Sequence, residues 1–344
     1  MNKKAGLYIH IPFCASKCPY CDFFSVKYDG ALAEKYVDRV VDEFKKYNGS
    51  FDTIYFGGGT PSIIEPHLIS KIINKAKEQF DIARDCEITV ECNPSKNLEK
   101  DFEQYADCGV NRISLGMQSA VNQERFALGR RAGKAEIERA VNQARQSGIN
   151  NISLDLMLGT PKQTLSSLDE TFDFIRQMNV EHISAYMLKI EEGTKFYEMQ
   201  NKLQLPQEDT VPEMYIKTVD FLNSIGLNQY EISNFAKEGY ESRHNTKYWQ
   251  LTDYLGIGAS AHSFWGGKRF YYTKDFEIID DGNGGGIDEQ IMLGLRLAKG
   301  IDKRLVTKDY SQFIKMNLMA ENDTNIYLTK EGMLVSNTII NALI

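Results

Sequence analysis

The chain has 344 residues, of which 42% are hydrophobic and 25% are charged, a composition typical of one large globular domain, alone or with an appendage. Forty basic and 47 acidic side chains give a net charge of −7, which argues against a nucleic-acid binder because such proteins usually present a basic face. No apolar stretch approaches the roughly 18 residues of a membrane span, and no secretory signal is expected, so the sequence predicts a cytoplasmic protein.

Short β-rich runs alternate with amphipathic helical runs through the first two thirds of the chain. The predicted strands cover Leu7–Ile11, Thr53–Phe56, Glu87–Glu91, Arg112–Gly116, Ile152–Leu156 and Ile183–Met187. The predicted helices between them cover Leu32–Tyr47, Pro66–Phe80, Leu98–Cys108, Ala135–Ser147 and Leu165–Met178. Three helical patterns in the chain are followed by a glycine, as a C-terminal cap would be, at Gly109, Gly148 and Gly226.

The repeated order of strand, helix and strand predicts an α/β fold with parallel strands joined by right-handed crossovers. Six such units in about 190 residues indicate a partial (β/α)6 barrel, short of the usual eight units. An incomplete barrel leaves an open side that could admit a bulky ligand. Residues 1–209 are assigned to this barrel. A doubly wound open sheet is the competing architecture, and hydrophobic periodicity does not separate the two.

The regular alternation of predicted strands and helices ends after residue 209. Residues 210–281 are expected to extend the barrel, with a helix at Val211–Ser224, a strand at Gln229–Ile232 and an aromatic, glycine-rich stretch through Trp265. Asp281–Gly286 is predicted to be a flexible turn or linker. Residues 282–344 then form a C-terminal α+β module that resembles a winged helix, with a helix at Glu289–Lys299 and a hairpin around Thr329–Gly332. The acidic balance favours a packing lid over contact with nucleic acid.

Three of the six cysteines lie on one short segment. Cys14, Cys18 and Cys21 have the spacing C-x3-C-x2-C, and close-set thiols in a cytoplasmic protein more often bind metal than form disulfides. Each thiolate can hold one iron of a cubane, whereas a [4Fe-4S] cluster normally takes four thiolates. Because no fourth cysteine is near, the fourth iron would be open to an exchangeable ligand. The other cysteines are expected to be small buried apolar residues, at Cys86, Cys92 and Cys108.

A structural zinc site that recruits His10 as the fourth ligand is the main alternative. His10 falls inside a predicted strand, however, where its side chain would point the wrong way for a loop-centred tetrahedron. A set of accidentally buried thiols is the second alternative. The two prolines and two aromatic residues of this segment make it a poor core segment, so the cluster is the favoured interpretation.

The cysteine motif resembles the signature of the radical S-adenosylmethionine (SAM) family. That resemblance implies a [4Fe-4S] cluster on Cys14, Cys18 and Cys21, with the methionine amine and carboxylate of SAM chelating the open iron, and electron transfer that yields a 5′-deoxyadenosyl radical. The run Tyr8-Ile9-His10-Ile11-Pro12-Phe13-Cys14 is similar to the group that contains oxygen-independent coproporphyrinogen III dehydrogenases and the heme chaperones of the HemW family. This similarity extends from Leu7 to the C-terminal module.

Polar and glycine residues follow the predicted strands, at the ends that face one mouth in a parallel barrel. Gly57-Gly58-Gly59-Thr60-Pro61 lacks the lysine of a phosphate loop, but its glycines let backbone amides approach a ligand. The resemblance implies SAM contacts by Tyr8, Gly58, Gly59, Thr60, Glu91, Gln118, Arg130 and Asp155, with Tyr20 against the adenine. A zwitterionic methionine moiety needs an anion and a cation, as Glu91 and Arg130 could supply; whether Arg130 or Arg131 faces the site stays open.

Two motifs separate a carrier from an enzyme. The oxidative decarboxylases of this group carry a further cysteine two places after the third, where this chain has Phe23; Cys21-Asp22-Phe23 instead resembles the heme chaperones. The segment 244–249 resembles the H-N-x-x-Y-W element of the same chaperones, which implies heme contact by His244, Asn245, Tyr248 and Trp249. Histidine is a common axial ligand of heme iron, and aromatic side chains suit the porphyrin face.

The alternative for this element is a helix start or turn whose aromatic residues pack into the core. His262 is a second candidate for heme contact, whereas His67 and His182 are expected to be structural or exposed.

The sequence thus predicts a heme chaperone that holds a [4Fe-4S] cluster and SAM, binds heme and passes it to acceptor proteins, with no catalytic residue assigned. The resemblance also implies that a homodimer forms as the cluster assembles. The alternative function is an oxygen-independent coproporphyrinogen III dehydrogenase, which Phe23 puts in doubt. A plain electron carrier fits poorly, because it needs neither a polar mouth nor 344 residues.

Overall fold

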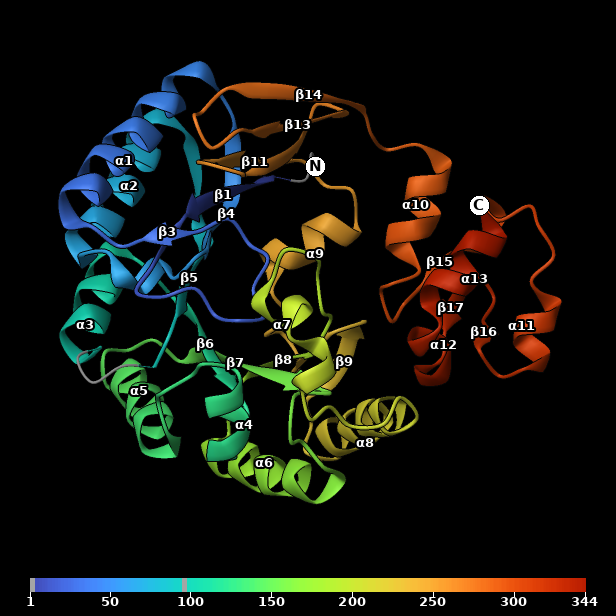
Figure 1. Cartoon of the computed structure of the whole chain (residues 1–344). Coiled ribbons are helices and arrows are strands. Elements are labelled where there is room, and N and C mark those ends of the chain that lie inside the picture. The colour runs from blue at the N-terminus through green and yellow to red at the C-terminus, as the bar shows by residue number, and fades with distance from the viewer. Residues whose placement is uncertain (1–3, 95–97) are drawn as a thin grey trace.

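Six parallel strands form the wall of an open barrel. The computed structural model describes residues 4–94 and 98–344. Within them, neighbouring strands pair in chain order, each parallel to the one before it (Figure 1). The strands are β1 (Ala5–Ile11), β4 (Ser50–Gly58), β5 (Asp81–Cys92), β6 (Arg112–Gln118), β7 (Asn151–Leu158) and β8 (His182–Met187). A doubly wound sheet would reverse its strand order, so the sequential order confirms the barrel and excludes the competing architecture.

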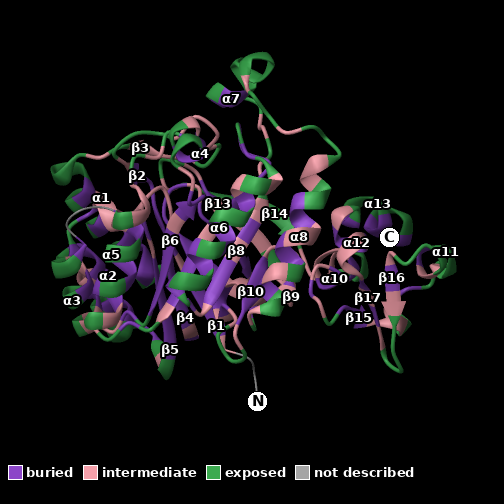
Figure 2. Ribbon diagram, turned by 90° about the horizontal axis from the view of Figure 1, so that it is seen from below, coloured by how far each residue is buried: buried purple, intermediate pink, exposed green. Residues whose placement is uncertain are grey.

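Helices cover the outside of this wall (Figures 1 and 2). They are α1 (Gly30–Glu43), α2 (Pro66–Gln79), α3 (Glu99–Cys108), α4 (Asn122–Ala127), α5 (Lys134–Gln146) and α6 (Leu165–Met178). In α6 the Thr164 hydroxyl accepts from the Ser167 backbone N–H, and the helix ends at Asn179 in the left-handed conformation. The glycine caps predicted at Gly109, Gly148 and Gly226 all have positive φ, which confirms that assignment.

Side-chain alternation gives the barrel two buried layers. Along β7, Ile152, Leu154 and Leu156 belong to the apolar core under the helices, and the residues between them point into the barrel. Ser153 and Asp155 are two of those inward residues, and each makes a hydrogen bond to a neighbouring strand. The apolar outer layer therefore holds the fold together, while the inner layer is polar.

Residues 228–283 extend the same sheet at both ends. At one end β10 (Asn234–Ala236) pairs antiparallel with β8 and with β9 (Asn228–Glu231). At the other end β11 (Tyr254–Ile257) runs parallel to β1 and leads to the antiparallel strands β12 (His262–Trp265), β13 (Lys268–Tyr272) and β14 (Ile278–Asn283). The linker predicted at Asp281–Gly286 is wrong in its first half, because the backbone of residues 281–283 completes β14. Only Gly284–Gly286 connect to the next helix.

The remaining elements of the barrel region connect or flank the strands already described. Among them are β2 (Phe13–Cys14), β3 (Val26–Lys27), α7 (Lys195–Glu198), α8 (Thr210–Ser224) and α9 (Arg243–Trp249). Single 3-10 turns occupy Phe44–Lys46, Pro61–Ile63, Gln200–Lys202 and, in the C-terminal module, Lys303–Leu305. The described residues contain no helix that combines the length and the apolarity needed to cross a membrane.

The C-terminal module stands beside the barrel (Figure 1). It contains α10 (Ile287–Gly294), α11 (Ser311–Lys315), α12 (Lys330–Leu334) and α13 (Ser336–Leu343), with a sheet of β15 (Ile301–Asp302), β17 (Asn325–Leu328) and β16 (Met319–Glu321). The Tyr215 hydroxyl of α8, which donates to the Ile232 carbonyl at 2.9 Å, also lies 3.6 Å from the Met333 sulfur, and Lys330 pairs with Asp220 at 2.7 Å. These contacts join the module to the barrel.

Two predictions in this module are wrong. The helix predicted at Glu289–Lys299 ends at Gly294. The hairpin expected around Thr329–Gly332 is instead the start of α12, because the Thr329 hydroxyl accepts from the Gly332 N–H as an N-terminal cap. The observed hairpin joins β16 to β17, a few residues earlier.

Truncation of the outer apolar layer should unfold the barrel more readily. Leu154→Ala, at a side chain with 0% exposure, is expected to lower the free energy of unfolding by about 3 kcal/mol. Leu205→Ala, at a side chain that is 40% exposed, is the matched control and should change it by less than about 1 kcal/mol. Urea denaturation followed by circular dichroism measures both, and equal losses would contradict the assignment of Leu154 to the core.

Candidate functional site

A cavity of about 490 Å³ opens at the carboxyl ends of the barrel strands. We call it the mouth cavity; it is lined by the cysteine loop, the glycine loop after β4 and the ends of β5 to β8. It brings together all three predicted cluster ligands and eight of the predicted SAM residues, namely Tyr20, Gly58, Gly59, Thr60, Glu91, Gln118, Arg130 and Asp155. Convergence at one mouth follows from the shared direction of parallel strands. Tyr8 is the exception, since it does not line the cavity.

The cysteine loop leaves β1 and is anchored by a small parallel pair. Cys14 is in register with Lys27 across β2 and β3, and the Cys21 N–H donates to the Cys18 carbonyl in a turn. All three thiols are free and partly exposed, and burial raises the pKa of Cys21. Across the described residues, no three His, Cys, Asp or Glu side chains already stand in metal-ligand geometry. The donor chemistry of three free thiols on one loop fits an iron–sulfur cluster.

Both ring nitrogens of His10 have hydrogen-bond partners outside the cysteine motif, so His10 is not available as the fourth ligand of a zinc site. Its ring nitrogens contact the Tyr8 hydroxyl at 3.1 Å and the Phe24 carbonyl at 3.3 Å. The side chain is 4% exposed and does not line the mouth cavity. Burial lowers the pKa of His10 to about 4, so it is a neutral, structural residue at neutral pH.

The glycine loop is clamped between β1 and the cysteine loop. The Gly59 N–H donates to the Ile11 carbonyl at 2.9 Å, and the Thr60 N–H donates to the Phe13 carbonyl at 2.8 Å. Gly58 has φ of +112°, and a Cβ atom there would lie 2.5 Å from His10 Cε1. A side chain at this position is excluded by both conformation and space. Thr60 Oγ1 lies 3.6 Å from the Cys14 sulfur, which ties this loop to the predicted cluster.

Two carboxyl groups lie inside the cavity with pKa values near neutrality. The Tyr55 hydroxyl donates to Glu91 Oε1 at 2.8 Å, and the Ser114 hydroxyl donates to Asp155 Oδ1 at 3.0 Å. Desolvation by burial is the main cause that raises the pKa of Glu91 to about 7 and the pKa of Asp155 to about 6. Each of these carboxyls therefore changes protonation within the physiological range.

Arg130 faces this cavity, which settles the choice between the two adjacent arginines. Its Nη2 and Nε donate to the Tyr20 hydroxyl at 2.9 and 3.3 Å, and its Nη1 contacts Asn93. Arg131 is exposed and does not line the cavity. Asn93 also donates to Thr60 Oγ1 at 3.1 Å, so it bridges Arg130 and the glycine loop. Asn93 was missed from the sequence, although a polar residue just after a predicted strand was the available signal.

Other missed residues lie on the inner faces of the strands. The Tyr186 hydroxyl donates to Gln118 Oε1 at 3.1 Å, and Gln118 has a positive φ of 66°. Further polar side chains line the cavity, at Tyr55, Ser114, Ser184 and Asn234. Within a strand, such residues resemble ordinary core positions, and only the barrel shows which face they occupy.

The H-N-x-x-Y-W element forms α9, whose N-terminus is capped by Ser242. Its conformation is thus the helix start that was the alternative in the sequence. Asn245 lines the mouth cavity, whereas His244 has 0% exposure and hydrogen bonds at both ring nitrogens. Tyr248 is one of those partners, and Trp249 lies under the Arg296 guanidinium at 5.7 Å. Heme contact by these four residues stays a prediction, and iron ligation by His244 would require α9 to move.

The other histidines occupy different surroundings. His67 lies exposed on α2, as expected. His182 is buried and hydrogen-bonded to Ser153 at 2.8 Å and to Tyr230 at 2.9 Å, which confirms a structural place for it. His262 is exposed and stacks on Tyr271.

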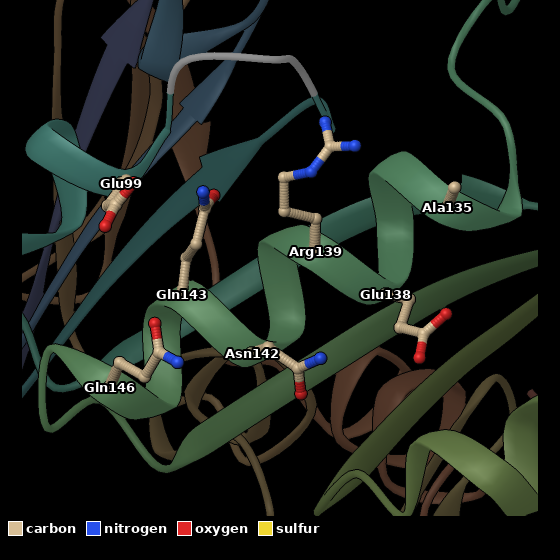
Figure 3. Close-up of a pocket in the computed structure, with 7 residues that line it drawn as sticks. All are labelled: Glu99, Ala135, Glu138, Arg139, Asn142, Gln143 and Gln146. Carbon is tan, nitrogen blue, oxygen red and sulfur yellow. The ribbon is translucent and has the colours of Figure 1, made fainter.

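A second hollow, on the outer surface, has a different character. It has a volume of about 340 Å³ and lies along α5 beside the start of α3 (Figure 3). Its lining is short amides, charged side chains and one alanine, namely Glu99, Ala135, Glu138, Arg139, Asn142, Gln143 and Gln146. Its described lining residues carry neither thiols nor aromatic rings, so the predicted chemistry belongs to the mouth cavity.

Comparison with known proteins agrees with this architecture. A sequence model of the Radical SAM superfamily matches residues 8–175. The chain is 31% identical over 375 residues to the heme chaperone HemW of Bacillus subtilis, a match that covers 98% of both proteins. It is 30% identical over 369 residues to HemW of Lactococcus lactis, covering 98% of this chain and 97% of that protein. The structure of coproporphyrinogen III oxidase (HemN) from Escherichia coli, a radical SAM enzyme, shares the fold, with a TM-score of 0.83 at 21% identity over 99% of this chain and 90% of that chain.

The open parallel barrel with its cysteine loop is thus a radical SAM fold. Over nearly its whole length, the chain belongs to the HemW family of heme chaperones within that superfamily. The resemblance stated from the motifs is confirmed at both levels.

The burial of the cysteines predicts how they react. In cluster-free, reduced protein, Cys14, Cys18 and Cys21 should react with a thiol reagent much faster than the buried cysteines, because all three are partly exposed and access controls the rate. Cys86 and Cys92 are buried, and burial raises the pKa of Cys86 to about 12 and that of Cys92 further, so both should react only after unfolding.

Absorbance titration with a chromogenic disulfide measures this difference. A variant with serine at Cys14, Cys18 and Cys21 should lose three rapidly reacting thiols. If Cys86 and Cys92 reacted as fast as Cys14 in the folded protein, the burial of these two cysteines and the exposure of the cysteine loop would be contradicted.

Proposed function

We propose that this protein is a radical-SAM-type heme chaperone: it holds a [4Fe-4S] cluster and SAM, binds heme and passes it to acceptor proteins. Phe23 is the observation that carries the choice between carrier and decarboxylase. It lines the mouth cavity two residues after Cys21, and its ring is 63% exposed. A phenyl ring cannot supply the thiol that decarboxylases of the group carry there, but it offers a flat apolar surface at the entrance.

The donor set of the mouth cavity supports the two cofactors. Cys14, Cys18 and Cys21 would hold the cluster, and a bound cluster with three protein ligands supplies an iron with an open coordination position. Arg130 and Glu91 present a guanidinium and a carboxyl to the polar groups of SAM. Tyr20, whose hydroxyl is held by Arg130, offers a ring for the adenine.

The rim of the same cavity supports heme binding. Phe23 and Met187 are both exposed at the mouth, the latter at 38%, and could cover an apolar macrocycle. Lys17 and Lys189 line the same rim, and ammonium groups attract carboxylates such as the heme propionates. The Met187 thioether is a ligand type that holds heme iron in other proteins. Of the predicted H-N-x-x-Y-W contacts, Asn245 is the residue that reaches this cavity.

Arg130 should be needed for SAM binding, whereas Arg131 should not. In anaerobically reconstituted protein with about four irons per chain, Arg130→Leu is expected to weaken SAM binding at least tenfold, because a charge-assisted hydrogen bond is lost. Arg131→Leu removes an equal charge from the exposed neighbour and should leave the dissociation constant within about twofold. Equilibrium dialysis with labelled SAM measures both; equal losses would reject the inward orientation of Arg130.

Heme and porphyrinogen assays run side by side test the function. Heme should bind at one equivalent per chain, and Phe23→Ala should weaken it about tenfold through the loss of apolar contact. Phe126→Ala is the matched control, since Phe126 is also 63% exposed but lies outside the mouth cavity. Reduced protein with SAM should not convert coproporphyrinogen III to protoporphyrinogen IX. Steady turnover, or heme binding unaffected by Phe23→Ala, would contradict the proposal.

A further inference from the structure

The helix α9 packs against β1 and β4, and its Asn245 lines the mouth cavity. We infer that His244 is a positioning residue for Glu91, acting through Tyr55, and that it is not a ligand of heme iron. This inference rests on the proposed function, because it concerns the SAM-binding carboxyl of the same site.

His244 is fixed from several directions. Its Nδ1 lies 2.7 Å from Thr53 Oγ1, and its Nε2 lies 2.9 Å from the Tyr248 hydroxyl. Its backbone N–H donates to Glu87 Oε1 at 3.1 Å. The ring packs over Gly6, where a Cβ atom would lie only 2.9 Å from His244 Cε1. A neutral imidazole has one donor and one acceptor nitrogen, and both nitrogens have partners here, so neither is free for iron.

The His244 imidazole contacts two residues of β4 that point into the barrel, Thr53 and Tyr55. Thr53 and Tyr55 lie two apart on the strand and so face the same side. His244 holds Thr53 by the hydrogen bond and stacks on the Tyr55 ring, with centroids 5.1 Å apart and an interplanar angle of 28°. Tyr8 stacks on the Tyr55 ring as well, at 6.2 Å. The Tyr55 ring is therefore held by Tyr8 and His244 together.

The Tyr55 hydroxyl donates to Glu91 Oε1 at 2.8 Å, so fixing the Tyr55 ring also fixes the position of the Glu91 carboxyl. Four groups act on the ionisation of this carboxyl besides burial: Tyr55, the Gly58 N–H and Arg112 lower its pKa, and Asp155 raises it. Loss of the Tyr55 hydrogen bond would free one carboxyl oxygen and raise the pKa of Glu91 further. Because the ionised carboxyl accepts hydrogen bonds best, SAM should then bind more weakly, and more so at lower pH.

His182, on β8, provides a matched control. It also has 0% exposure and also bonds a strand hydroxyl and a tyrosine, namely Ser153 and Tyr230. In the described part of the chain, its side-chain contacts are with these two residues and include neither Tyr55 nor Glu91. A general loss of stability should affect His182→Phe and His244→Phe alike, whereas a loss of positioning should affect His244→Phe alone.

The test measures SAM and heme binding in reconstituted protein with a full cluster. Tyr55→Phe should weaken SAM binding about tenfold at pH 6.5 and less at pH 8.5. His244→Phe should weaken it about threefold or more, with the same pH trend, and the double variant should be no weaker than the weaker single variant, because both act through one contact. Heme affinity and the Soret spectrum should not change. Thr53→Val, which removes the anchor of His244 with little change in shape, serves if His244→Phe does not fold.

Three outcomes would overturn the inference. SAM binding by His244→Phe or Thr53→Val at the wild-type level is the first, and an equal loss in His182→Phe is the second. A shifted Soret band with unchanged SAM affinity in His244→Phe is the third, and it would restore the heme-ligand role. If the wild-type protein itself bound no SAM, the proposed function would fail, which is distinct from variants that match a competent wild type.

Discussion

The alternation of side chains along parallel strands is the constraint on which this molecule depends. Alternate residues of β1 and β4–β8, such as Leu7, Ile54 and Leu154, pack under the helices, and that apolar layer holds the barrel. The residues between them are thereby free to be polar, and several are histidines, tyrosines, carboxyls and hydroxyls that bond one another across strands. Because all these strands run in one direction, their polar inner residues end at the same mouth of the barrel. The cysteine loop and the glycine loop line the cavity at that mouth.

Burial gives this polar interior its chemical properties. Desolvation brings Glu91 to a pKa of about 7 while Tyr55 keeps one of its oxygens in place. The same desolvation keeps His10 and His244 neutral by lowering the pKa of each. The protonation of the two cavity carboxyls can thus change when a ligand binds, whereas the two histidines stay neutral and hydrogen-bonded. A ligand that enters the mouth cavity meets Glu91 and Asp155, whose carboxyl groups are oriented by hydrogen bonds from Tyr55 and Ser114.

Much of the barrel could be predicted from the sequence, because strands buried on one face and helices with one apolar side leave strong periodic signals; the helix at Leu165–Met178 matches residue for residue. The site residues at strand ends could be predicted because chain direction places them together. Tyr55 could not, since inside a strand it resembles any core tyrosine. The place of His244 also could not, because its partner Thr53 is 191 residues away. Thr329 misled the prediction of a hairpin because caps and turns favour the same residues.

The central claim is that three thiolates leave one iron open for SAM. Electron–nuclear double resonance on the reduced, anaerobically reconstituted cluster, with SAM labelled with ¹⁵N at its amino group, tests this most directly. We expect a ¹⁵N hyperfine coupling that shows direct ligation of iron by the methionine amine. A cluster whose spectrum is indifferent to the label, or a loop that retains zinc in place of iron, would contradict the claim.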